Sequence, residues 1–263
     1  MAIPPSGAQY EIAFEDQHVT VVEVGGGLRA YRVGDREVLD GYAVDAICRS
    51  GRGQVLAPWP NRIAGGTYEW DGEHLELALT EPENGNAIHG LVRWASWDAV
   101  EHEASRVLMK HVLHPQPGYP FPLLLHVECR LGSDGLTVST TAENVGVRAC
   151  PFGAGHHPYL KAPSGRVADL VVDGELLGSK VLDDPKRMDA PWRIAVDDIT
   201  VWADASWKHV QLFTGDPLPD VARRSLAVEP MTCPPNAFQT GEGVIRLEPG
   251  EAFAGTWGIE VAG

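Results

Sequence analysis

The sequence predicts an all-β fold, a large antiparallel β-sandwich or barrel, and three observations lead to this expectation. Short segments alternate apolar and polar residues, so that one face of each strand meets a core and the other meets water. These segments recur about every 8–12 residues, and turn-forming residues separate them, since the chain contains 29 glycines and 20 prolines. No stretch of about 12 residues carries the capped 3.6-residue apolar period of an amphipathic helix.

Four segments alternate most clearly: residues 10–14, 74–79, 125–131 and 136–142. Gly132-Ser133-Asp134-Gly135 joins the last two and predicts a hairpin, and Asp71-Gly72 predicts another after residues 68–70. Further strands are expected at 20–24, 167–172, 209–213, 226–228, 244–247 and 256–261. Because no linker, repeat or charge block interrupts the pattern, residues 1–263 are expected to form one domain, with 1–8 as a loose terminus.

Composition excludes several classes of protein. Hydrophobic residues make up 44% of the 263 residues, which is enough for a full core and excludes wholesale disorder. The net charge of −15 repels phosphates and anionic lipids, so neither nucleic acid nor membrane is an expected partner.

The expected compartment is the cytoplasm. The segment Met1–Gly7 has no basic region followed by an apolar one, and no stretch is long and apolar enough to span a membrane. The four cysteines (Cys48, Cys129, Cys150 and Cys233) fit no zinc-binding spacing. Two disulfides are arithmetically possible, but free thiols in a reducing compartment are the favoured interpretation.

Two segments place a polar side chain beside turn residues. Arg62 stands between apolar residues in Pro58-Trp59-Pro60-Asn61-Arg62-Ile63, where a guanidinium can act as a fixed donor fork for hydroxyls or a carboxylate. His89 follows the Asn84-Gly85-Asn86 turn. For each residue the alternative is structural: a surface arginine after a loop, or a histidine whose hydrogen bonds are satisfied within the fold.

A third segment contains the adjacent pair His156-His157, and a fourth contains Glu229. Adjacent residues of an extended chain point to opposite faces, so at most one of the two histidines enters a given cleft. This spacing also suits a metal poorly, and no metal is expected. Glu229 ends an apolar run and precedes Pro230, so it is expected at a strand end, partly desolvated and with a raised pKa. The alternative is a carboxylate that simply faces water.

Together these segments supply one arginine, two candidate histidines and one carboxylate. The sequence contains no nucleophile elbow, phosphate-binding loop or dinucleotide fingerprint. The chemistry best served is therefore proton transfer on a neutral polar ligand, with no cofactor.

At these residues the sequence resembles the aldose 1-epimerase (mutarotase) family, particularly its bacterial members. The resemblance covers about residues 10–160 and 205–260, and its pieces occur in the family's order. They are Pro60-Asn61-Arg62-Ile63 with Gly65 and Tyr68, Ile88-His89-Gly90, His157-Pro158-Tyr159, Val228-Glu229-Pro230 through Asn236-Ala237-Phe238, Leu247-Glu248-Pro249-Gly250-Glu251 and Trp257-Gly258-Ile259. The fold that this resemblance implies is the galactose mutarotase-like supersandwich.

The resemblance also implies roles. Glu229 corresponds to the general base that takes the proton of the anomeric hydroxyl, and His157 to the general acid that protonates the ring oxygen. Arg62 and His89 correspond to residues that hold sugar oxygens. The implied substrate is a monosaccharide such as glucose or galactose, the implied protein is a monomer or homodimer, and neither cofactor nor metal is needed.

One position departs from the family. The family usually has an aspartate, followed by an aromatic residue, that grips sugar hydroxyls, and it should lie between Lys161 and Trp207. Asp183 is the nearest match, although Pro185-Lys186 stands where the aromatic residue is expected, and the segment is short. Its rivals are Asp184, Asp197 and Asp198. Two alternatives to a mutarotase of free hexoses remain: a hexose-6-phosphate 1-epimerase, which would need a basic phosphate pocket, and a non-catalytic sugar-binding protein on the same scaffold.

Overall fold

The computed structural model describes residues 3–262, and these are nearly all β, as predicted. The helical segments within them are short: η1 (Pro82–Asn84), η2 (Val167–Asp169) and α1 (Ala237–Thr240). None of the described helices has the length and apolarity to cross a membrane.

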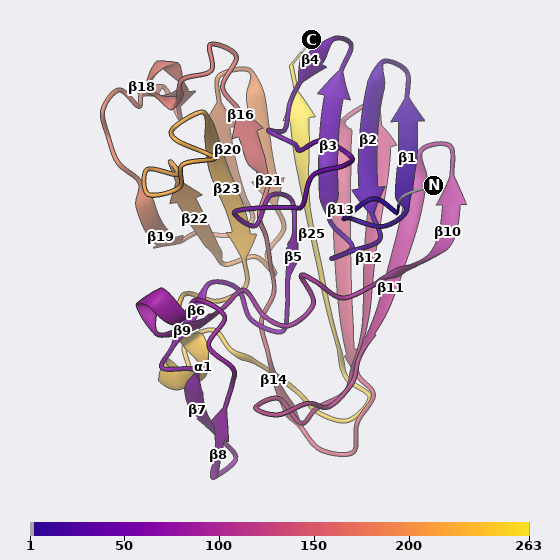
Figure 1. The fold of residues 1–263 in the computed structure, drawn as a ribbon, viewed down its shortest axis with the longest axis vertical. Helices are drawn as coiled ribbons and strands as arrows, with labels where there is room; N and C mark the ends of the chain where they lie inside the picture. Colours follow the sequence, from indigo (N-terminus) through magenta and orange to yellow (C-terminus); the bar gives the residue numbers. More distant parts are fainter. Residues whose placement is uncertain (1–2, 263) are drawn as a thin grey trace.

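The largest sheet has nine strands, and all of its pairings are antiparallel. Strand β25, the last of the described strands in sequence order, lies in the middle of the sheet between β13 and β21 (the yellow arrow in Figure 1). The order across the sheet is β10 (Asp98–Glu103), β11 (Arg106–Leu113), β12 (Leu123–Gly132), β13 (Gly135–Asn144), β25 (Ala252–Val261), β21 (Ile199–Ala203), β20 (Trp192–Val196), β17 (Val171–Val172) and β18 (Glu175–Leu176).

A second sheet of six strands carries most of the candidate site residues. Its order is β19 (Asp183–Arg187), β22 (His209–Phe213), β23 (Ser225–Met231), β15 (Gly155–His156) and β5 (Val55–Leu56), and β16 (Tyr159–Lys161) also pairs with β23. A third sheet contains β1 (Gln9–Phe14), β2 (Gln17–Val22), β3 (Leu28–Val33) and β4 (Arg36–Glu37).

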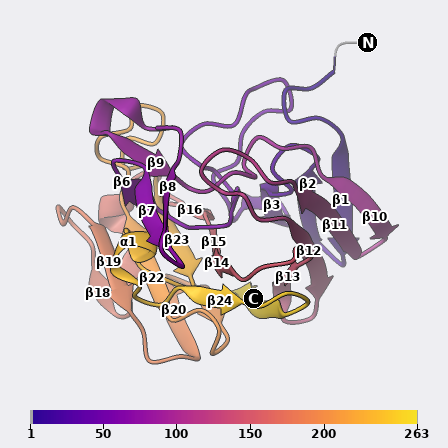
Figure 2. The ribbon, with the colours of Figure 1, turned by 90° about the horizontal axis from the view of Figure 1, so that it is seen from below.

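Three strand pairs complete the fold. They are β6 (Arg62–Ala64) with β9 (Asn86–Ile88), β7 (Thr67–Trp70) with β8 (Glu73–Glu76), and β14 (Cys150–Phe152) with β24 (Ile245–Leu247). The first two pairs lie at one end of the β22–β23 sheet, next to α1 (Figures 1 and 2). They bring Arg62 and His89 to the same end of the molecule as β23.

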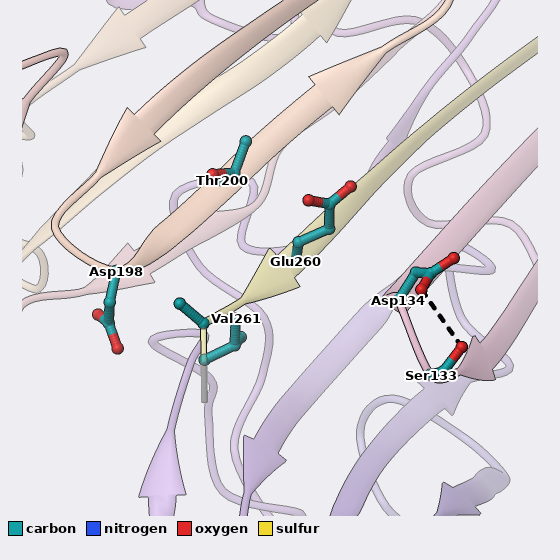
Figure 3. A pocket seen from close by; sticks show the side chains of 7 residues that line it. Ser133, Asp134, Asp198, Thr200, Glu260 and Val261 are labelled. Carbon is teal, nitrogen blue, oxygen red and sulfur yellow. Dashed lines mark hydrogen bonds between the residues drawn. The ribbon is translucent and has the colours of Figure 1, made fainter.

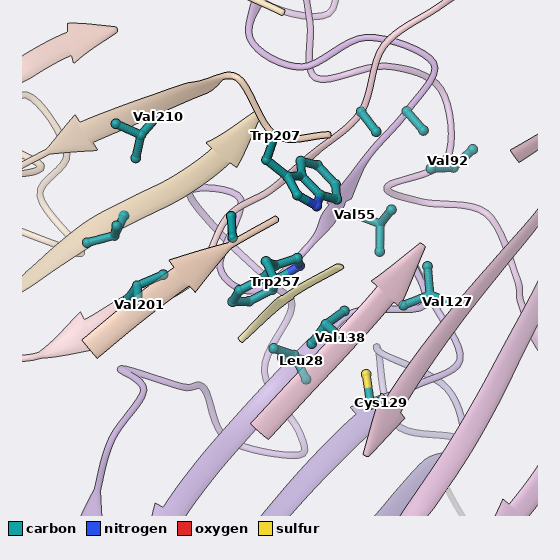
Figure 4. Packing of buried hydrophobic residues seen from close by; sticks show 14 of the residues in the cluster. Leu28, Val55, Val92, Val127, Cys129, Val138, Val201, Trp207, Val210 and Trp257 are labelled. Atoms are coloured by element: carbon teal, nitrogen blue, oxygen red, sulfur yellow. The ribbon is translucent and has the colours of Figure 1, made fainter. Parts of the chain in front are cut away.

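Apolar side chains from all three sheets fill the space between them. Figure 4 shows Trp207 and Trp257 beside valines of several strands, and both indole rings are fully buried. Truncation of such a ring to alanine typically costs about 3–5 kcal/mol. This packing fixes the sheets relative to each other and supports the residues behind the site. All four cysteines are buried and unpaired.

Three local expectations are corrected by the structure. Residues 167–169 form the turn η2 instead of a strand, and Val167 is buried with its N–H bonded to the carbonyl of Arg223 (2.7 Å). The terminus is not loose over residues 6–8, because Ser6 is buried and its carbonyl accepts a bond from Val24 (3.0 Å). Residues 1 and 2 of that expectation lie outside the described residues.

The third correction concerns Glu229, which lies inside β23 and not at its end. Pro230 is paired with Val210, so the ladder to β22 continues through the proline. Amide directions alternate along a strand, so position 230 faces the same side as Val228, whose N–H bonds the carbonyl of Pro158 (3.2 Å). The missing donor of Pro230 therefore falls on the side of β15, and the ladder to β22 stays intact.

Candidate functional site

Glu229 and His157 are brought together by strand register. Strand β23 pairs with β15 at Gly155 and with β16 at Tyr159. His157 and Pro158 lie between the end of β15 at His156 and the start of β16, and they interrupt the edge. The same register places His157 opposite Glu229, with both side chains on one face of the sheet. The distance from His157 Nε2 to Glu229 Oε1 is 3.4 Å.

Glu229 is a buried carboxyl group with an unsatisfied oxygen. Its side chain is 2% exposed, and Oε2 has no hydrogen-bond partner in the described part of the chain. Burial raises the pKa of Glu229 well above its ordinary value, the charge of Asp183 raises it further, and the charge of Arg62 opposes both. A carboxyl group in this state is suited to accept a proton near neutral pH.

His157 is held as a neutral imidazole. Burial lowers its pKa to about 3, and the charges of Arg93 and Arg52 act in the same direction. Its ring stacks on Tyr159, with a distance of 4.8 Å between ring centroids. On another side it meets Gly51, where a Cβ would lie 2.8 Å from His157 Cδ2. The ring is thus fixed beside Glu229, while Nδ1 has no hydrogen-bond partner among the described residues.

His156 points away from this site into the core. Its Nε2 is 2.8 Å from the hydroxyl of Thr140, and its ring packs against Trp207 and Trp257. Burial lowers the pKa of His156 to about 3, so this ring is also neutral. The alternation of an extended chain thus separates the adjacent histidines: His157 lies on the side of Glu229, and His156 belongs to the packing behind it.

Arg62, at the start of β6, is oriented by Glu81. Its Nε and Nη2 donate to the two carboxylate oxygens of Glu81 at 2.8 and 2.9 Å. These bonds lower the pKa of Glu81 to about 2, so the pair is fully charged in neutral solution. A bidentate pair of this kind fixes the plane of the guanidinium and leaves Nη1 to meet a ligand. Arg62 also lies close enough to Glu229 for each charge to shift the other's pKa.

His89 follows β9 and has left-handed backbone geometry, with φ of 61°. The N–H of His89 donates to the carbonyl of Asn61 (2.8 Å), and the N–H of Asn61 donates to His89 Nδ1 (3.2 Å). Burial holds the pKa of His89 well below its ordinary value, so the ring is neutral. Because Nδ1 accepts a hydrogen bond, the ring proton is on Nε2, which makes that atom a donor. The ring meets His157 edge-on, with centroids 5.3 Å apart.

Glu229 on β23, Gln211 on β22 and Asp183 on β19 form a row of polar side chains across three neighbouring strands. Gln211 is paired with Glu229, is 2% exposed, and donates from Nε2 to Asp183 Oδ1 at 2.5 Å. The rival aspartates lie elsewhere: Asp184 is 3.6 Å from Lys186, Asp197 accepts a bond from the N–H of Val171, and Asp198 pairs with Arg36. Of the four aspartates, the structure brings Asp183 to the row.

A pocket of about 350 Å³ opens beside this group of residues, although Glu229, Gln211 and Asp183 are not among the residues that line it. Arg62, His89 and His157 line it, and the residues that sequence analysis missed are Glu81, Arg93 and Gln211, with Tyr159 noted only as part of a motif. Only Tyr159 carried a signal, since it lies two residues after His157 and therefore faces the same side. Glu81, Arg93 and Gln211 reach the site through tertiary pairing, which the sequence does not reveal.

Figure 3 shows a different hollow, lined by Ser133, Asp134, Asp198, Thr200 and Glu260. Its side chains are exposed or half-exposed, and Asp198 and Glu260 are already paired with Arg36 and Arg193. It contains none of the buried titratable groups that mark the first pocket. We therefore take the pocket lined by His157, whose ring lies 3.4 Å from the carboxyl group of Glu229, as the functional one.

The arrangement can move protons between two neighbouring oxygens. Glu229 is a base with a raised pKa, and the adjacent His157 carries a proton on a neutral ring. A ligand whose two reacting oxygens share one carbon atom fits two groups 3.4 Å apart. In residues 3–262, no three His, Cys, Asp or Glu side chains are clustered so as to hold a metal ion.

Comparison with known proteins identifies relatives of this chain. Residues 9–177 match the family model described as aldose 1-epimerase. The uncharacterized protein YihR of Escherichia coli K12 is 30% identical over 284 aligned positions, which cover 94% of this chain and 91% of that protein. The uncharacterized protein YphB of the same organism is 28% identical over 133 positions, covering 48% and 41% of the two chains.

Solved structures share the fold at low identity. The GalM/aldose epimerase homologue from C. elegans has a TM-score of 0.82 with 15% identity and covers 97% of this chain and 99% of its own. A putative aldose 1-epimerase from Escherichia coli K12 has a TM-score of 0.78 with 17% identity and the same coverage. From the family match over residues 9–177, together with the YihR alignment, we conclude that this chain belongs to the aldose 1-epimerase family.

Proposed function

We propose that this protein is a cofactor-independent aldose 1-epimerase that interconverts the α and β anomers of an aldohexose. The observation that carries the proposal is the cross-strand pair, with His157 Nε2 3.4 Å from Glu229 Oε1. In a cyclic sugar the anomeric hydroxyl oxygen and the ring oxygen share one carbon. One base and one acid placed side by side therefore match the two atoms that must lose and gain a proton.

In the proposed reaction, the buried pair holds one transferable proton, and once the sugar is bound this proton is on His157, opposite the Glu229 carboxylate. Glu229 takes the proton of the anomeric hydroxyl as the His157 imidazolium donates its proton to the ring oxygen, which leaves a neutral carboxyl group and a neutral imidazole. The bond between the anomeric carbon and the ring oxygen breaks and leaves the free aldehyde. Rotation about the adjoining carbon–carbon bond exposes the other face of the carbonyl. The ring closes with the proton roles reversed, so Glu229 and His157 regain their starting states.

The surrounding residues hold the sugar in place. Arg62 offers Nη1 and neutral His89 offers its Nε2–H to sugar oxygens, while Asp183 and Gln211 stand on the far side of Glu229. The unsatisfied buried atoms Gln211 Oε1, Glu229 Oε2 and His157 Nδ1 are in keeping with a ligand rich in hydroxyl groups. The four buried, unpaired cysteines are in keeping with the cytoplasmic location expected from the sequence.

Polarimetry on freshly dissolved α-glucose and α-galactose tests the proposal against the spontaneous rate in the same buffer. We expect acceleration by the native protein and its loss in Glu229→Gln, which keeps the shape of the side chain and removes its basicity. The matched control is Glu103→Gln, because Glu103 is 68% exposed at the edge strand β10. Binding without acceleration by the native protein would support a sugar-binding protein instead.

The pH dependence of the rate gives an independent test. Because the pKa of Glu229 is raised, the rate should fall on the acid side of a midpoint that lies above 4.5, the usual value for a glutamate. That limb should be absent from any residual activity of Glu229→Gln. Full turnover with an unchanged pH profile in the variant would show that the base is another group.

A further inference from the structure

The pocket contains a guanidinium group that no carboxylate of residues 3–262 neutralises. Arg93 lines the pocket with His89 and His157. Its neighbour is the ring of Trp94, 6.0 Å from the guanidinium carbon, and its side chain makes no hydrogen bond or ion pair with another residue in the range 3–262. By contrast, the buried Arg52 is paired with Asp40 and Asp220, and Arg62 is paired with Glu81.

Arg93 is partly buried as well as unpaired within residues 3–262. Burial is the main cause that lowers its pKa, and the influence of Cys48 and then the charge of Glu81 only partly offset it. Removing a cation from water without a counterion is costly, so buried arginines usually have an anionic partner. The planar fork of a guanidinium fits carboxylate, sulfate and phosphate oxygens particularly well.

The remaining charges of the pocket do not supply that partner. Glu81 is engaged by both ends of the Arg62 fork, and the exposed Glu83 lies at the rim with no ion-pair partner of its own within the described residues. The exposed Arg49 also lines the pocket, and its side chain has no ion-pair partner in that same range. In the described part of the chain, this pocket is thus lined by two arginines without an ion-pair partner, Arg49 and Arg93, and by one such carboxylate, Glu83, in a protein with a net charge of −15.

Arg93 also lies close to the reacting groups. Burial is the main cause that lowers the pKa of His89 and of His157, and the charge of Arg93 lowers both pKa values further. A sugar with its anomeric carbon at Glu229 and His157 would therefore place another of its substituents at Arg93. The pocket, at about 350 Å³, lies in the usual size range for a small-molecule site.

We infer that the aldose taken by this pocket carries an anionic substituent, a carboxylate, sulfate or phosphate group on a carbon other than the anomeric one, which pairs with Arg93. The inference rests on the proposed function, since it assumes that a sugar binds with its anomeric carbon at Glu229. The net charge of −15 alone would disfavour an anionic ligand. The charges that line the pocket, however, decide which ligand binds there, whereas the net charge describes the average over the whole surface.

The test is a panel of four sugars that share one ring and differ in one substituent. Glucose is neutral, glucuronate carries a planar monoanion, glucose 6-sulfate a tetrahedral monoanion and glucose 6-phosphate a tetrahedral dianion. Exchange between anomers is followed by NMR magnetisation transfer, and kcat/KM is compared within the panel. We expect at least one anionic sugar to exceed glucose by about tenfold or more, with a preference that weakens as salt is added. The preferred member identifies the anion.

The variant Arg93→Gln should lower the ratio of kcat/KM for that anionic sugar over glucose by about tenfold or more. Arg93→Lys, which keeps the charge and loses the fork, should recover part of the ratio. Arg130→Gln is the matched control, because Arg130 is 57% exposed on β12 and pairs only with Glu128 in the described structure. A ratio that is the same in the native protein and Arg93→Gln would overturn the inference, and so would a native preference for glucose over all three anions.

Binding separates this inference from the proposed reaction. Calorimetric titration of Glu229→Gln with the same four sugars measures affinity without turnover. If no sugar is turned over by the native protein but an anionic sugar binds about tenfold more tightly than glucose, the epimerase proposal fails and the anion site stands. If all four sugars are turned over and none of the anions is preferred in rate or affinity, the epimerase proposal stands and the anion site is wrong.

Discussion

Glu81 holds the guanidinium of Arg62 through two hydrogen bonds, of 2.8 and 2.9 Å, although neither strand β6 nor β9 contains Glu81. Asn86 donates a third bond to the same carboxylate at 2.7 Å. Glu81 therefore acts as a positioning residue, which ties Arg62 to the turn before β9 and keeps its free Nη1 at the pocket.

The variant Glu81→Gln should weaken this anchor, because the amide replaces one acceptor oxygen with a donor. We expect kcat/KM for the preferred sugar to fall by about 10–100-fold. Most of this change should be a rise in KM, and the pH profile should keep its shape. Glu76→Gln, an exposed carboxylate on β8, is the control. If Glu81→Gln and Glu76→Gln have equal kinetics, the orientation of Arg62 does not depend on Glu81.

The variant Glu229→Gln should change stability in a pH-dependent way. The pKa of Glu229 is raised in the folded protein, so its contribution to stability is full below the unfolded pKa near 4.5 and is lost as pH rises through the folded value. Above that value the native protein buries an ionised carboxylate, and the variant does not. The melting temperature of Glu229→Gln minus that of the native protein should therefore increase with pH. A difference that decreases with pH would contradict the raised pKa.

The adjacent histidines should respond differently to the same substitution. His157→Asn removes the proposed acid and should lower kcat by about 10²–10⁴-fold. His156→Asn removes a ring packed on Trp207 and Trp257 and should lower stability by about 1–3 kcal/mol, with most activity retained in the molecules that remain folded. Steady-state kinetics and urea titration of both variants measure the two effects, and an exchange of the two phenotypes would reverse the assignment.

Gly51 offers a test of how closely His157 must be held. Its φ is 73°, and a Cβ at this position would meet His157 Cδ2 at 2.8 Å. Gly51→Ala should displace the ring from Glu229 and lower kcat by at least tenfold. Gly165→Ala is a matched control, because Gly165 has φ of 74° and open space around its Cβ position. Both variants carry similar backbone strain, so a difference in kcat reports the contact with His157; equal kcat values would show that this contact does not matter.

Local sequence patterns predicted the parts of the fold that depend on alternation. The hairpin of β12 and β13 and the all-β class are confirmed, because each strand's apolar residues recur every second position. The same rule anticipates that His156 and His157 point to opposite sides. The rule that proline ends a strand is wrong at Pro230. The missing N–H points away from β22, so the ladder to β22 continues, and the sequence does not reveal which strand lies on each side of β23.

The rest of the site depends on contacts between distant segments. The partner of Arg62 lies 19 residues away, and the pairing of Gln211 with Asp183 spans 28 residues. Such contacts follow from strand order, which alternation within one strand does not determine. The expectation that residues 1–263 form one domain stays a prediction, although a continuous hydrophobic cluster runs from Ile12 to Ile259.

The central position of β25 has a consequence for synthesis of the protein. A nascent chain that has emerged only as far as residue 251 lacks Ala252–Val261, so the edges of β13 and β21 are left without their shared neighbour. Two long unpaired edges can bind other extended chains, including those of neighbouring ribosomes. The nine-stranded sheet is completed only after β25 has left the ribosomal tunnel, and the indole of Trp257 enters the core at that same moment. Folding of this sheet is therefore expected to wait until residues 252–261 have been synthesised, and chaperones that shield strand edges should associate with the chain until then.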